Sequence, residues 1–247
     1  MMSTITATDP KASVLPLLEG SIWPGAAEAL AHVYALPVPT SRTEAWKYTR
    51  VGRLFNQPYA TSNGKANVAL PARLPFPVTR VVFVNGNFRA DLSDELKGQK
   101  GLVIDSLKNH LTHGPVKEHY GTLAAMEERL FTAMNTAAPT DGMILLVTKG
   151  VRVVKPILFI HITTAGRQLV QPRDLFMLQE GAEAEVIIEH LALDAPESLV
   201  NSVRECVVGD GARLSIHKLQ HEVNGPANIS FEGVRVAAKG HYSISTT

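Results

Sequence analysis

The sequence predicts a mainly β protein: a right-handed parallel β-helix (a β-solenoid) preceded by a small α-helical N-terminal domain. Two observations predict this class. Helical spacing broken by prolines dominates up to about residue 77, whereas alternating β-branched residues dominate after Asp141. Within the second region, glycines recur at an almost constant interval, which is typical of stacked β coils.

Composition and charge limit the classes of function. The chain has 247 residues, 45% hydrophobic and 19% charged, with a net charge of +1. Such a charge gives no global attraction to nucleic acid or to an anionic membrane. The longest apolar runs are far shorter than the ~20 residues that span a bilayer, and residues 1–20 show no secretory pattern. With a single cysteine, Cys206, we expect a cytoplasmic protein that binds neither nucleic acid nor membrane.

The N-terminal domain is predicted over residues 1–77. Apolar residues at helical spacing follow Pro24, and Pro37 and Pro39 end that helix. Residues 56–77 are rich in Pro, Gly, Asn and Ser, which indicates a linker.

The β-helix core is predicted over residues 78–247. It begins with a strand, an Asn-Gly turn at 85–86 and a return strand, then a strand in "GLVIDSL". "TLAAMEERLFTAMNTA", residues 122–137, predicts an amphipathic helix, with one apolar face formed by Leu123, Met126, Leu130, Ala133 and Met134.

A repeat of about 30 residues follows. Gly150, Gly181, Gly211 and Gly240 lie at intervals of 31, 30 and 29, each between two β-rich runs. Glycine at such turns allows the positive φ that the backbone needs to enter the next strand. The chain ends in "HYSISTT" inside a repeat, where a solenoid needs a cap. We therefore expect the β-helix to be incomplete in this chain.

Residues with catalytic or metal-binding chemistry are few. No phosphate-binding loop, HExxH motif or cysteine pair occurs, so we expect no catalytic residues. The candidates for a metal role are Cys206, His217 and His221; the two histidines lie four apart in a strand-like run and share a face. The alternative is structural: a buried inert thiol and two solvated histidines.

The segment "LPVPTSRTEAWKYTRVGRL" predicts an anchored helix start. Ser41 and Glu44 have the spacing of a capping box. Trp46 and Tyr48 offer apolar area to dock the helix, and Lys47 or Arg42 can lie over a ring. A structural role for these residues is favoured over a binding patch.

The same segment resembles the N-terminal signature of the SufB/SufD family of iron–sulfur cluster assembly proteins, and within it the SufD branch. The resemblance continues in "VVFVNGNF", "KPILFIHIT", "EGAEAEVIIEH" and "GARLSIHKLQHE", and spans about residues 30–247. The matching signature positions are Pro39, Thr40, Arg42, Glu44, Trp46, Lys47, Tyr48 and Thr49, with Ser41 inserted.

The resemblance implies a non-catalytic scaffold. It would pair with a SufB-like homologous subunit and a SufC-like ABC-type ATPase, and the isolated chain could also form a homodimer. A nascent iron–sulfur cluster would be built on the assembled complex and passed to acceptor proteins, with no cofactor held stably by this chain. The family's C-terminal helical domain and a late β-helix histidine have no counterpart before Thr247.

Two alternatives remain open at the level of sequence. One is a β-helix carbohydrate-active enzyme, a lyase or glycosidase, which would need clustered carboxylates or calcium. The other is an interaction module without any link to clusters.

Overall fold

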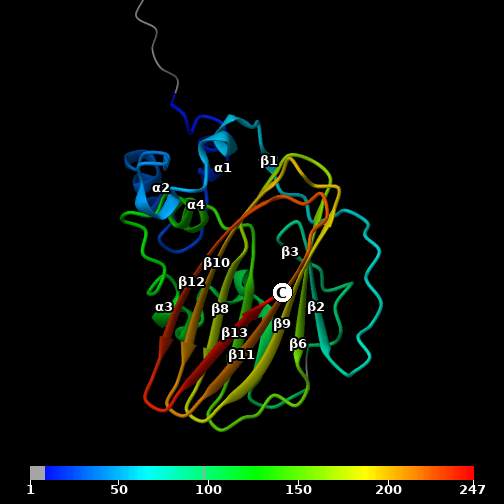
Figure 1. Cartoon of the computed structure of the whole chain (residues 1–247). Helices are drawn as coiled ribbons and strands as arrows, with labels where there is room; N and C mark the ends of the chain where they lie inside the picture. The colour runs from blue at the N-terminus through cyan, green and yellow to red at the C-terminus, as the bar shows by residue number, and fades with distance from the viewer. Residues whose placement is uncertain (1–8, 97) are drawn as a thin grey trace, which may run out of the picture.

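Alternating apolar runs form two parallel sheets that face each other across a common interior. The computed structural model describes residues 9–96 and 98–247 and shows a β-solenoid of about three turns with a few N-terminal helices (Figure 1), so the predicted fold class is confirmed. No described helix has the length and apolar character needed to cross a membrane.

The N-terminal part contains mostly short helical elements. They are α1 (Leu15–Leu18), α2 (Ala26–Ala35), the 3-10 turns η1 (Glu44–Trp46) and η2 (Gly52–Asn56), and the strand β1 (Ala60–Thr61). Lys11 fixes the end of α2, because its buried Nζ donates to the carbonyl oxygens of Val33, Tyr34 and Leu36 at 2.7–2.9 Å. Such charge-assisted bonds satisfy carbonyls that a helix end leaves free.

The first sheet lies beneath the helices. Its order is β1-β7-β10-β8-β5-β4, with β12 on the free side of β10. The strands β5, β8, β10 and β12 pair in parallel, whereas β4 pairs antiparallel with β5. Their bounds are β4 (Leu102–Ser106), β5 (Met143–Val147), β7 (Gln168–Val170), β8 (Arg173–Leu178), β10 (Leu199–Val208) and β12 (Ala227–Val236).

The second sheet has the order β13-β11-β9-β6-β2-β3. All its pairs are parallel except the β2–β3 hairpin, where Asn85 and Gly86 form the turn with φ of 49° and 73°. The predicted Asn-Gly hairpin is thereby confirmed. The strands are β2 (Thr79–Val84), β3 (Asn87–Phe88), β6 (Ile157–Thr164), β9 (Glu183–Leu193), β11 (Arg213–His221) and β13 (His241–Thr246).

The solenoid interior is apolar near the glycine turns. Phe83, Phe159 and Phe176 belong to one buried cluster with aliphatic residues from both sheets. Separate clusters cover the outer faces. Helix α4 (Leu130–Ala137) packs on the first sheet, as do η3 (Leu107–His110) and α3 (Gly114–His119), whereas apolar side chains of residues 66–78 cover part of the second.

Three of the four repeat glycines form the predicted turns. Gly150, Gly181 and Gly211 have φ of 69°, 65° and 62°, and each donates its N–H to the next turn at 2.8–3.0 Å. The prediction for Gly240 is wrong, because the positive φ falls on Lys239 (55°). The cause is the register: Arg213 pairs with His241, so the position equivalent to Gly211 is residue 239.

The helix predicted over residues 122–137 is too long. α4 begins only at Leu130, and all eight of its residues are buried, so its polar residues are covered as well as its apolar face. The preceding segment is held in a turn because Glu205 accepts the N–H groups of Gly121 and Leu123 at 2.8 and 2.7 Å.

The predicted Ser41–Glu44 capping box is also wrong. The helix-like segment is a single 3-10 turn that begins after Thr43 and has no side-chain cap. Instead, the hydroxyls of Thr40 and Thr43 accept the backbone N–H groups of Arg42 and Thr40 at 3.2 and 3.3 Å.

Candidate functional site

A column of charged side chains interrupts the apolar interior of the solenoid. Asp174, Arg204 and Glu232 occupy equivalent positions on β8, β10 and β12. Asp174 and Arg204 each lie two positions before a residue of the buried interior cluster, Phe176 and Cys206, and so share the face of those residues. Glu232 is paired in register with Arg204 and continues the column on β12. The Arg204 guanidinium bridges its neighbours, with Nη2 2.8 Å from Asp174 Oδ2 and Nη1 3.2 Å from Glu232 Oε2.

Two histidines and a lysine extend this column from the opposite sheet. The rings of His161 on β6 and His190 on β9 stack with centroids 5.2 Å apart, and His161 stacks on Phe83 at 5.0 Å. Burial lowers the pKa of His161 to about 3 and that of His190 to about 2, and the positive charges of Arg204 and Lys218 act in the same direction. Both imidazoles are therefore neutral at neutral pH.

Lys218 on β11 completes the group. Burial lowers its pKa, and the nearby Arg204 lowers it further, whereas Glu232 and Asp174 oppose the shift. Because the two carboxylates and two cations balance, the column is close to neutral as a whole. We find no group of three or more potential ligands that could hold a metal ion among the residues the structure describes.

Cys206 lies in the interior, away from the two candidate histidines. Its thiol is fully buried, and burial raises its pKa above the ordinary range. At neutral pH it is therefore a protonated thiol, which is a poor metal ligand.

His217 and His221 lie on the outer face of the second sheet. His217 Nε2 is 3.4 Å from Glu185 and its Nδ1 is 3.0 Å from the Ser245 hydroxyl, while His221 Nδ1 is 3.4 Å from Glu189. Both histidines are exposed. The structure therefore does not bring the three metal candidates together.

The N-terminal segment divides into one anchored and several exposed side chains. The Trp46 ring packs on Phe131, with centroids 5.1 Å apart, whereas Tyr48 is 91% exposed. The docking role expected of Tyr48 is therefore wrong. Lys47 Nζ lies 5.5 Å from the Tyr48 ring centroid, and Arg42 and Glu44 are exposed.

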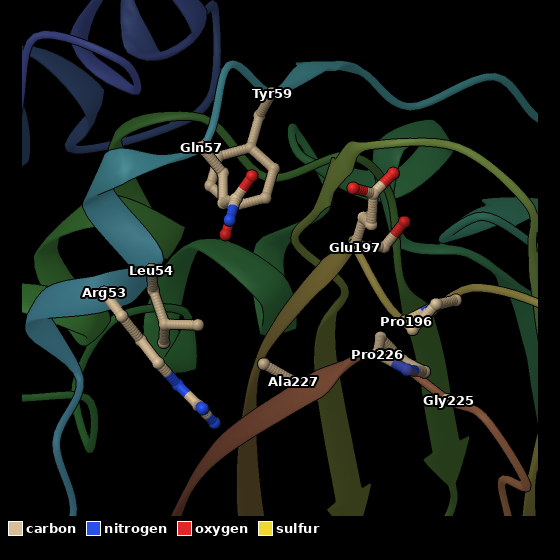
Figure 2. A pocket seen from close by; sticks show the side chains of 10 residues that line it. Arg53, Leu54, Gln57, Tyr59, Pro196, Glu197, Gly225, Pro226 and Ala227 are labelled. Carbon is tan, nitrogen blue, oxygen red and sulfur yellow. The ribbon is translucent and has the colours of Figure 1, made fainter.

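A surface pocket lies between this segment and the solenoid. Its volume is about 330 Å³. Figure 2 shows Arg53 and Leu54 of η2 on one side, and Glu197, Pro196 and Pro226 from two solenoid loops on the other. Tyr59 is nearly buried at the edge of this pocket.

The interior column was not anticipated from the sequence, although a signal was present. Asp174, Arg204 and Glu232 are separated by 30 and 28 positions, close to the glycine period. Charged residues that recur at a repeat period, each two positions before an apolar residue, indicate a column.

Comparisons with known proteins cover nearly the whole chain. The SufBD protein N-terminal region matches residues 25–159, and the SufBD core domain of the SUF system for FeS cluster assembly matches residues 160–247. An iron–sulfur cluster assembly SufBD family protein of Synechocystis sp. is 23% identical over 237 residues, covering 89% of this chain and 51% of its own length. The iron–sulfur cluster assembly protein SufD of Escherichia coli K12 is 27% identical over 205 residues, covering 81% and 46%. The chain thus spans about half the length of these curated relatives.

Proposed function

The chain belongs to the SufBD family of iron–sulfur cluster assembly proteins, and on that premise we propose that it is a non-catalytic scaffold subunit of a SufBCD-type complex. The observation that carries the proposal is the consecutive match of the N-terminal and core regions over residues 25–247. The family role in cluster assembly also leaves no reason to retain the carbohydrate-enzyme alternative.

The proposed complex contains a SufB-like homologous subunit and a SufC-like ABC-type ATPase, and it acts in the cytoplasm. ATP is hydrolysed by the ATPase subunit, and the nascent cluster is cargo that passes to acceptor proteins. The structure supports a scaffold role through Cys206: a buried, protonated thiol is unsuited to hold iron by itself.

Co-expression and gene deletion test this function together. The protein, tagged and co-expressed with the SufB-like and SufC-like subunits of the same genome, should co-elute with both in size-exclusion chromatography. Deletion of its gene should lower the activity of an iron–sulfur enzyme such as aconitase, and a plasmid copy should restore it. Elution of the protein alone, together with unchanged aconitase activity after deletion, would contradict the proposal.

A further inference from the structure

In the segment from Arg42 to Arg53, two apolar residues pack against the rest of the protein, whereas the charged residues are exposed to solvent. Trp46 packs on Phe131, and Val51 is buried in the same cluster. Between these two anchors, backbone hydrogen bonds from Lys47 to Glu44, from Thr49 to Trp46 and from Val51 to Thr49 fix successive turns at 3.0–3.3 Å. Residues 47–50 therefore project outward from a fixed backbone, which lowers the entropy lost when a partner binds.

This segment concentrates unpaired positive charge. Arg42, Lys47, Arg50 and Arg53 are exposed, and none forms an ion pair or a side-chain hydrogen bond within residues 9–96 and 98–247. Four cations and the single carboxylate of Glu44 leave three positive charges in 12 residues of a chain whose total is +1. Several other exposed arginines of the molecule are paired, for example Arg73 with Asp94 and Arg167 with Glu197.

An aromatic side chain and a hollow lie next to these cations. Tyr48 is 91% exposed, and the cation over its ring is Lys47. Tyrosine and arginine are among the residue types most enriched where protein interfaces bind tightly. Arg53 also borders the pocket of about 330 Å³, whose apolar lining includes Leu54, Pro196 and Pro226 (Figure 2). That hollow is large enough for one side chain of a partner.

We propose that the surface formed by Arg42, Lys47, Tyr48, Arg50 and Arg53, with the adjoining pocket, docks an acidic segment of a partner protein that also carries an apolar side chain. Charge complementarity selects the carboxylates, and the pocket takes the apolar side chain. Glu44 lies within the surface and the cationic stretch is short, which disfavours the continuous phosphate backbone of a nucleic acid. The inference does not rest on the proposed role in cluster assembly.

Fluorescence anisotropy tests the surface with defined probes. The probes are a fluorescein-labelled peptide of alternating Glu and Leu residues, the same peptide with Gln for Glu, and a single-stranded DNA 12-mer. The protein should bind the Glu peptide saturably and the other two more weakly. The triple variant Lys47→Glu, Arg50→Glu and Arg53→Glu should weaken binding of the Glu peptide about tenfold or more, and Tyr48→Ala should weaken it several-fold.

A matched control separates this surface from general electrostatics. Lys108→Glu, Lys117→Glu and Lys155→Glu change three other exposed lysines and give the same net charge, and this variant should bind the Glu peptide like the unaltered protein. Thermal unfolding verifies that all variants fold. The proposal is overturned if the Glu peptide does not bind, if both triple variants lose binding equally, or if the DNA binds more tightly than the peptide.

Discussion

The ion pair between Arg173 and Glu205 is the most deeply buried one in the described part of the chain. Arg173 Nη2 lies 2.6 Å from Glu205 Oε2, and both side chains are 0% exposed. Arg173 also stacks on Tyr120 and donates to Thr136 at 2.9 Å, while Glu205 accepts two backbone N–H groups. One pair therefore fixes α4 and residues 121–123 against the solenoid.

Replacing Glu205 by Gln should lower the free energy of unfolding by about 3–5 kcal/mol, because it leaves the Arg173 cation buried without a counter-charge. Urea unfolding at neutral pH measures the loss. The matched control is Arg167→Gln, which breaks a similarly short pair with Glu197 (2.7 Å) whose side chains are about half exposed. That change should cost about 0–1 kcal/mol. Equal losses in the two variants would show that burial does not increase the contribution of the ion pair to the free energy of unfolding.

The burial of Cys206 could be predicted from sequence, but that of Arg173 and Glu205 could not. An isolated cysteine in an apolar run is normally buried, and Cys206 is. Charged residues are rarely buried without a partner. The partners here lie 32 residues apart and meet only because adjacent coils stack.

At the scale of elements, η1 depends on one aromatic contact. Trp46 reaches Phe131 of α4, which also contacts Phe55 of η2 at 5.8 Å between ring centroids. The three rings connect the N-terminal turns to the helix that covers the first sheet.

Trp46→Ala should lower the free energy of unfolding by about 2 kcal/mol, less than the ~3–5 kcal/mol of a fully buried ring because Trp46 is only partly buried. Tyr48→Ala, two residues away, should change it by less than about 0.5 kcal/mol. Chemical denaturation of both variants tests this pair of values. A loss at Tyr48 as large as that at Trp46 would contradict the separation into an anchored and an exposed ring.

Strands were easier to predict than helices for a physical reason. Each coil must meet its neighbour in register, so the period of the glycine turns is repeated along the sequence and can be detected there. The segment before α4 is instead held by Glu205, a residue of a distant strand that accepts the N–H groups of Gly121 and Leu123. A local pattern contains no information about such a distant partner.

At the scale of the whole molecule, the solenoid has an apolar and a charged interior region. Phe159 and Ile188 lie on the same strand faces as His161 and His190, two positions before each. The local sequence could not indicate that these histidines meet Arg204 and Lys218, because those residues come from other strands and, for Arg204, from the opposite sheet.

This interior makes the stability of the whole molecule dependent on pH. His161 and His190 have pKa values lowered to about 3 and about 2 in the folded protein, against about 6.5 when unfolded. Below pH 6.5 these two imidazoles therefore bind protons in the unfolded chain but stay unprotonated in the folded chain. Stability should be full above that pH and fall toward pH 3, by at most about 1.4 kcal/mol per pH unit for each histidine.

Urea unfolding between pH 5 and 7 measures this slope above the range in which most carboxylates titrate. The double variant His161→Gln and His190→Gln should flatten it, because glutamine stays neutral at every pH. The matched control His217→Gln removes an exposed histidine of the outer face and should keep the slope of the unaltered protein. A slope that persists in the double variant would mean that other groups cause the loss. A flattened slope only in that variant would show that the two buried imidazoles cause the loss of stability, in keeping with their burial and with the positive charges of Arg204 and Lys218, which oppose their protonation.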